Sequence, residues 1–84
     1  MDWWWNDMKY EIIRTLIIEA MERVNVNPYG ITIYNTKRGM AVAFISAFGE
    51  SVKDCFGYNE NITDLRKKAD SLCDRFEKID KPFA

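Results

Sequence analysis

Few side chains in this sequence could carry out chemistry, and histidine, the commonest general base and metal ligand, does not occur. The two cysteines, Cys55 and Cys73, therefore lack an imidazole that could deprotonate a nucleophilic thiol. Asp70 and Asp74 stand one helical turn apart, yet two carboxylates fall short of the roughly six to eight oxygens that calcium takes. The four glycines are dispersed and form no phosphate-binding loop. We therefore predict a protein that is not an enzyme, with no catalytic residue, no metal site and no cofactor.

The composition is that of one small globular domain. The 84 residues are 48% hydrophobic and 14% aromatic, which is too apolar for a disordered chain and too short for two domains. Twelve basic and thirteen acidic residues give a formal charge of −1, which argues against a strongly basic nucleic-acid binder. We predict a single domain over residues 1–84, with an aromatic N-terminal arm or helix extension over 1–6 and a core over 7–80.

The cysteine content and the N-terminal residues indicate a location. Two cysteines are too few for the disulfide framework of a small secreted domain, so we expect free thiols and a cytoplasmic protein. Asp2 and Asp7 occupy the place of the basic region of a secretory signal, and Arg14 interrupts the apolar stretch Ile12–Ile18. The longest apolar run, Gly39–Gly49, is shorter than the roughly 18 residues that a membrane-spanning helix needs. We expect no membrane partner.

Two segments have the apolar spacing of amphipathic helices. From Asn6 to Val24, and again from Ile62 to Ile79, apolar residues recur every three or four positions. Asn61 stands where the second helix needs an N-cap. The inward faces should consist of Tyr10, Ile13, Leu16, Ile17, Ala20, Met21 and Val24 in the first helix, and of Ile62, Leu65, Ala69, Leu72, Phe76 and Ile79 in the second.

Three strand-like segments lie between these helices. Ile31–Tyr34 alternates β-branched and aromatic residues, and the polar turn Asn35–Gly39 follows it. Met40–Phe48 is apolar on both sides, which is typical of a central strand. Its alternation places Met40, Val42, Phe44 and Phe48 on one face and Ala41, Ala43, Ile45 and Ala47 on the other. Ser51–Tyr58 forms the third segment. We predict an α+β fold: a single two-layer domain of order α-β-β-β-α, whose three-stranded antiparallel sheet is covered on one face by the two helices.

The three consecutive tryptophans are the most unusual feature of the sequence. Because Trp3, Trp4 and Trp5 would span about 200° on a helix, they cannot all enter one core. If the first helix extends back through them, Trp4, Met8 and Ile12 form a second apolar stripe on the side away from the core. This stripe either folds back over its own domain or docks a partner, because tryptophan is enriched among residues that dominate interfaces. The predicted partner-binding residues are Trp3, Trp4, Trp5, Met8 and Ile12.

The predicted element order resembles that of the double-stranded-RNA-binding domain from Met8 to Phe76. Lys67-Lys68-Ala69 is similar to the basic motif near the start of that family's last helix, and the first turn of the sheet is also basic. The sequence departs from the family because its turn has no histidine and no glycine-serine pair precedes Lys67. The resemblance implies an alternative function as a nucleic-acid-binding module, which the net charge disfavours. Its binding residues would be Lys37, Arg38, Arg66, Lys67 and Lys68.

We predict a non-enzymatic protein-interaction domain that binds and blocks or bridges a macromolecular partner. In size, charge, aromatic content and lack of catalytic groups, the chain resembles the small inhibitors that phages and mobile elements encode, anti-CRISPR proteins among them. The expected partner is a protein or a macromolecular complex, with a homodimer as a second form of contact and nucleic acid as the alternative class.

Overall fold

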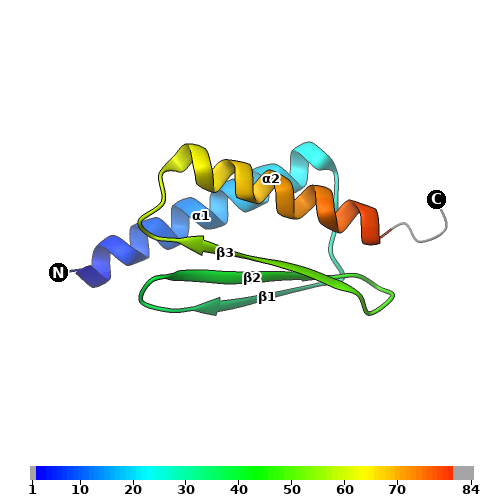
Figure 1. Ribbon diagram of the computed structural model, residues 1–84, viewed down its shortest axis with the longest axis horizontal. Coiled ribbons are helices and arrows are strands. Elements are labelled where there is room, and N and C mark those ends of the chain that lie inside the picture. Colours follow the sequence, from blue (N-terminus) through cyan, green and yellow to red (C-terminus); the bar gives the residue numbers. More distant parts are fainter. Residues whose placement is uncertain (1, 81–84) are drawn as a thin grey trace.

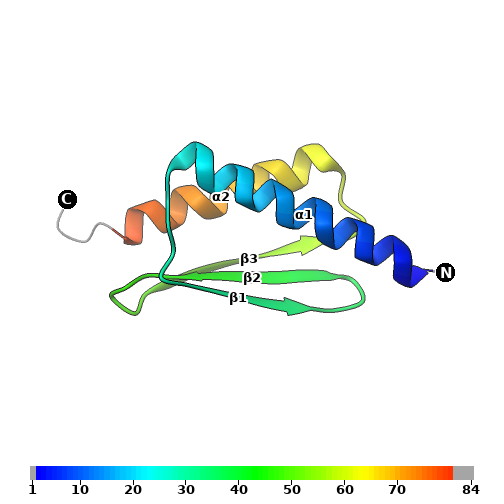
Figure 2. The same cartoon turned by 180° about the vertical axis from the view of Figure 1, so that it is seen from behind.

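The computed structural model describes residues 2–80, and their side chains from Met8 onward. Its elements, in chain order, are α1 (Asp2–Val24), β1 (Gly30–Asn35), β2 (Gly39–Ile45), β3 (Ser51–Gly57) and α2 (Ile62–Ile79). The strands form one antiparallel sheet in the order β1-β2-β3. Both helices lie on the same face of this sheet (Figures 1 and 2). The predicted two-layer α+β fold is therefore confirmed.

Helix α1 begins earlier than its predicted start at Asn6, because Asp2 is already helical. Residues 2–6 therefore continue the helix and do not form a separate arm. The helix ends where Asn25 adopts a left-handed conformation with φ 61°, and the Val26 N–H donates to the Met21 carbonyl at 3.1 Å. This six-residue closure is the usual way to satisfy a helix C-terminus. Neither helix within residues 2–80 has the length and apolar content to cross a membrane.

The predicted hairpin between the first two strands is confirmed. The Thr36 N–H donates to the Gly39 carbonyl at 2.8 Å, and Thr36 Oγ1 accepts from the N–H groups of Arg38 and Gly39 at 3.2 Å. Glycine is required at position 39 because a Cβ there would lie 2.3 Å from the Phe56 carbonyl oxygen. The backbones of β2 and β3 thus approach closely at this end of the sheet.

Strand β2 ends at Ile45, three residues before the predicted end at Phe48. Ser46 closes the next turn: its N–H donates to the Glu50 carbonyl at 2.7 Å, and its Oγ accepts from the N–H groups of Phe48 and Glu50. The prediction that Phe48 shares the inward face of Met40 is wrong, because the chain has already turned and Phe48 is 58% exposed. A serine that bonds to nearby backbone competes with strand pairing.

The core lies between the inner face of the sheet and the two helices. Met40, Val42 and Phe44 of β2 are fully buried, as the alternation predicted. The helices contribute Ile13, Leu16, Ile17 and Ala20 from α1, and Leu65, Ala69, Leu72, Cys73 and Phe76 from α2. The prediction that Ile62 belongs to the inward face is wrong, because this first residue of α2 is 42% exposed. Asn61 caps α2 as expected, since its side chain accepts from the Asp64 N–H at 2.9 Å. The outer face of the sheet, which carries Ala41, Ala43 and Ile45, faces away from both helices.

Candidate interaction surface

Of the groups that could carry chemistry, Cys73 and Asp70 are engaged in the fold, whereas the Cys55 thiol is exposed. Cys55 and Cys73 are free thiols, and burial together with nearby Asp70 and Asp74 raises the pKa of Cys73 to about 11. Asp70 accepts a hydrogen bond from Arg23, so it joins α1 to α2. Within residues 2–80, no group of three or more cysteines and acids is placed to hold a metal ion. Cys73 is therefore a neutral core side chain at physiological pH.

The basic residues that the resemblance implies lie in three separate places. Lys37 and Arg38 are in the turn between β1 and β2, and both are exposed. Arg66 lines a shallow hollow between the helices, together with Glu19, Glu22, Arg23 and Asp70. Lys67 is exposed on α2, but the neighbouring Lys68 reaches the edge of β3. Acids therefore accompany Arg66 and Lys68, and the five residues form no continuous basic surface.

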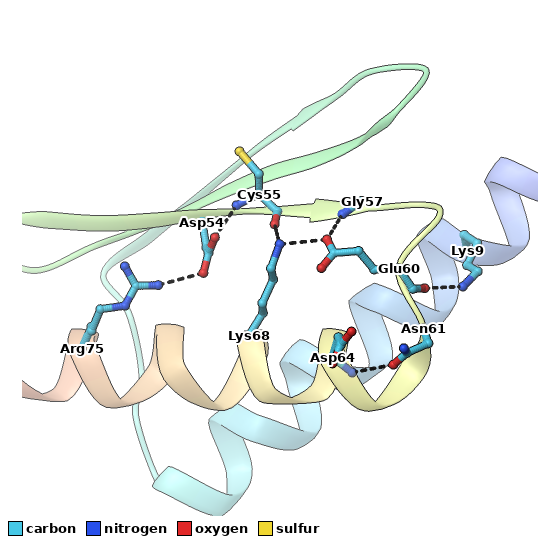
Figure 3. A network of polar contacts seen from close by, with 9 residues as sticks. All are labelled: Lys9, Asp54, Cys55, Gly57, Glu60, Asn61, Asp64, Lys68 and Arg75. Carbon is cyan, nitrogen blue, oxygen red and sulfur yellow. Dashed lines mark hydrogen bonds and ion pairs between the residues drawn. The ribbon is translucent and has the colours of Figure 1, made fainter.

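A network of side chains closes the outer edge of β3 (Figure 3). Lys68 Nζ donates to the Cys55 carbonyl at 2.8 Å, and Arg75 donates to the Lys53 carbonyl at 3.3 Å. The Gly57 N–H donates to Glu60 Oε2 at 2.7 Å. Backbone groups that a further strand would need are thus already bonded to α2 and to the loop before it. Such capping is a common protection of an edge strand.

Ion pairs hold this network in place. Lys68 Nζ lies 2.8 Å from Glu60 Oε2, and Arg75 lies 3.0 Å from Asp54 Oδ2. The hydrogen bond from Lys68 lowers the pKa of Glu60, and the same bond raises the pKa of Lys68. Lys9 of α1 donates to the Glu60 carbonyl at 3.0 Å, so the loop before α2 is tied to both helices. Helix α2 and strand β3 therefore form one firmly connected side of the domain.

The predicted partner-binding residues all lie on the N-terminal half of α1. Met8 is 48% exposed, whereas Ile12 is half-buried and packs against the core. The side chains of Trp3, Trp4 and Trp5 lie outside the described part of the structure. Their backbone is helical, and the first turns of α1 extend past the β1–β2 turn and past the start of α2 along the long axis (Figures 1 and 2). The described sheet and α2 do not reach this part of the helix.

A second surface, which the sequence analysis missed, runs along β1. Ile31 and Ile33 belong to the inner face, yet they are 46% and 39% exposed because α1 covers this edge only in part. They line an apolar groove of about 270 Å³ beneath α1, whose other lining residues include Arg14, Ile17 and Ile18. Alternating apolar residues in Ile31–Tyr34 predicted the strand, but no sequence signal showed which edge the helices leave open.

Comparisons with known proteins indicate no function for this chain, so the function is argued from its surfaces. No protein-family model, no curated protein and no solved structure matches this chain.

Proposed function

We propose that this chain is a non-enzymatic protein-interaction domain that binds a macromolecular partner through the N-terminal half of α1. It would act by binding and blocking a surface of its partner, as do the small inhibitors that phages and mobile elements encode, anti-CRISPR proteins among them. The observation that carries the proposal is the projection of α1 past the sheet and α2. Three tryptophans in this projecting segment offer a partner more aromatic surface than one helix face can bury in its own core.

The rest of the surface supports binding as the mode of action. Met8 continues the aromatic segment along the helix and is exposed. Asp70 pairs with Arg23, and Cys73 is buried with a raised pKa, so these candidate reactive groups have structural roles. A partner that covers tryptophan and methionine side chains gains large apolar contact area from few residues. The proposed site is therefore the segment from Trp3 to Met8.

Affinity purification from the native host, followed by mass spectrometry, would identify the partner, and calorimetry with the purified partner would measure its affinity. We expect Trp4→Ala to weaken binding by about 2 kcal/mol or more, while the free energy of unfolding stays within about 0.5 kcal/mol. Ile62→Ala is the matched control, since Ile62 is a 42%-exposed apolar residue on α2. A loss confined to unfolding would instead mean that the tryptophans cover their own domain.

A further inference from the structure

The two edge strands of the sheet differ in the hydrogen bonding of their outward backbone groups. At β3, Cys55 and Lys53 carbonyls accept from Lys68 and Arg75, and the Gly57 N–H donates to Glu60. At β1, no described side chain from Met8 to Asp80 bonds to the outward backbone of Ile31 or Ile33. In Figure 2, β1 is the edge strand that lies on the side away from α2. As far as the described residues show, β1 is therefore the edge that remains open to a further strand.

The pairing pattern shows which backbone groups face this open edge. In an antiparallel ladder, successive residues of a strand bond alternately to the neighbours on its two sides. The outward groups of β3 belong to odd-numbered residues from Lys53 to Gly57, so the even-numbered residues of β3 bond to even-numbered residues of β2. The odd-numbered residues of β2 then bond to the even-numbered residues of β1. Ile31, Ile33 and Asn35 consequently direct their N–H and C=O groups away from the sheet.

Strand β1 also lacks three common protections of an edge strand, namely charged residues, proline and a bulge. Gly30–Asn35 contains no charged residue and no proline, and its register with β2 is continuous, without a bulge. Natural edge strands commonly carry lysine, proline or a bulge, since these features prevent pairing with another chain. An uncharged strand is compatible with a copy of itself, because no like charges meet across the pair.

We propose that two copies of this chain associate through β1, so that their sheets join into one continuous antiparallel sheet around a two-fold axis at Ile33. In this register the outward backbone groups of Ile33 bond to those of Ile33 in the second copy. Those of Ile31 bond in the same way to Asn35 of the second copy. A two-fold interface must be self-complementary, and this pairing satisfies each outward residue of β1 with another outward residue.

The side chains fit the same register. Ile33 meets its own copy on the inner face, where it is 39% exposed in the single chain. On the outer face, Thr32 lies opposite Tyr34 of the second copy, and Tyr34 is 69% exposed in the single chain. Aromatic and β-branched residues form favourable cross-strand pairs. Both faces of the joined strands therefore gain contacts from residues that the single domain leaves uncovered.

Charge complementarity between the two α1 helices supports a second copy as the occupant. Ile33 lines one hollow together with Tyr10 and Glu11, and it lines the adjoining apolar groove together with Arg14. Along α1, Ile33 therefore lies level with the turn between Glu11 and Arg14. A two-fold axis at Ile33 runs the two helices antiparallel and places Glu11 of each copy opposite Arg14 of the other. In the single chain these two side chains form an ion pair with each other at 3.7 Å, and both are more than half exposed, so each can also reach an opposite charge of the second copy. Opposite charges thus meet above the joined strands.

Light scattering on the full chain after size exclusion tests the proposal. At about 100 µM we expect twice the mass of one chain, and Ile33→Lys should raise the dissociation constant at least about 100-fold. Ile62→Lys is the control, because it places the same charge at an apolar position of similar exposure on α2. A monomeric wild type would overturn the proposal. A dimer that resists Ile33→Lys would also overturn it.

A charge exchange on α1 tests the register and does not disturb β1. Glu11→Arg and Arg14→Glu should each weaken the dimer about tenfold, and the two together should restore it. If circular dichroism shows that Ile33→Lys does not fold, the charge-exchange variants alone test the proposal. A double variant that does not recover the dimer would overturn the proposed register. Trp4→Ala separates the outcomes, since it should reduce partner binding through α1 and leave the β1 dimer in place. If the wild type dimerises but binds no partner, only the proposed function is refuted. If it binds a partner through α1 but stays monomeric, only the β1 dimer is refuted.

Discussion

The rings of Phe44 on β2 and Phe76 on α2 meet edge to face, with centroids 5.7 Å apart and planes at 89°. Both side chains are fully buried, so this contact joins the sheet to the helical layer at the centre of the core. Edge-to-face pairs add about 0.5–1.5 kcal/mol to the free energy that burial of the rings supplies. The pair therefore anchors α2 to the central strand of the sheet.

Truncation of one ring should strongly destabilise the domain. We expect Phe76→Ala to lower the free energy of unfolding by about 3–5 kcal/mol, because it removes buried apolar surface and leaves a cavity. That amount approaches the whole stability of many small domains. Urea unfolding followed by circular dichroism measures the change. Ser71→Ala, an exposed position on the same helix, should stay within about 0.5 kcal/mol. Similar midpoints for Phe76→Ala and the wild type would contradict this packing.

Two glycines in the sheet should differ in how much stability they lose when a methyl group is added. At Gly39, a Cβ would lie 2.3 Å from the Phe56 carbonyl oxygen, so Gly39→Ala must push β2 and β3 apart. At Gly30, a Cβ would meet Ile45 at 3.7 Å, which is ordinary van der Waals contact. We expect a loss of about 2 kcal/mol or more for Gly39→Ala and less than about 0.5 kcal/mol for Gly30→Ala. Thermal unfolding of the two variants makes the comparison, and equal melting temperatures would refute it.

The two thiols should differ in reactivity. Cys55 is exposed on the outer side of the sheet, whereas Cys73 is fully buried and its pKa is raised to about 11, chiefly by burial. Because the thiolate is the reactive form, iodoacetamide at about pH 8 should label Cys55 alone in the folded protein and both thiols in urea. Mass spectrometry counts the labels, and Cys55→Ser should leave none under native conditions. Rapid labelling of Cys73 in the folded chain would show that α2 opens readily.

Much of the fold could be predicted because its signals are local. The spacing of apolar residues in α2 and the cap at Asn61 specify that helix within a few neighbouring residues. The boundaries that were missed depend on competition between local alternatives. Ser46 bonds to the backbone of its own turn and ends β2, and Asn6 lies within α1 although its residue type favours a cap.

The candidate surfaces were harder to predict because they depend on contacts between distant parts of the chain. Lys68 resembled a nucleic-acid contact in its sequence motif, yet it bonds to Cys55 at the edge of β3. Arg75 reaches Lys53 and Asp54 on the same strand, and this difference between the edges leaves β1 open. The apolar pattern of Ile31–Tyr34 is the same whether a helix covers it or not. Sequence spacing therefore identified the strand and could not identify its exposure.

The pair formed by Glu60 and Lys68 should make stability depend on pH. The bond from Lys68 lowers the pKa of Glu60 below its ordinary value of 4.5, so this contribution is present above about pH 4.5 and is lost as pH falls through the folded-state pKa. The raised pKa of Lys68 keeps the contribution present below about pH 10.5 and removes it as pH rises further.

Substitution of Glu60 tests this dependence. Glu60→Gln should lower the free energy of unfolding at pH 7 by no more than about 1 kcal/mol, because both side chains are about a third exposed and water screens the pair. The difference from the wild type should shrink as the pH falls below about 4. Urea unfolding between about pH 3 and pH 7 measures it, with Glu50→Gln as a control that touches neither Lys68 nor Gly57. A difference that is constant over this range would contradict the assignment.

Nucleic-acid binding should be weak and should not depend on Lys68. Its ammonium group is already bonded to Glu60 and to the Cys55 carbonyl, and Arg66 lies beside acidic side chains. Affinity for phosphates grows with the number that basic residues neutralise, so we expect duplex RNA or DNA to bind no tighter than about 10⁻⁴ to 10⁻⁶ M at physiological salt. Fluorescence anisotropy with a labelled duplex measures this. Lys67→Glu should change it little, whereas Lys68→Glu should act mainly on stability by placing a second acid beside Glu60. Saturable nanomolar binding that Lys67→Glu abolishes would instead establish the nucleic-acid-binding module as the function.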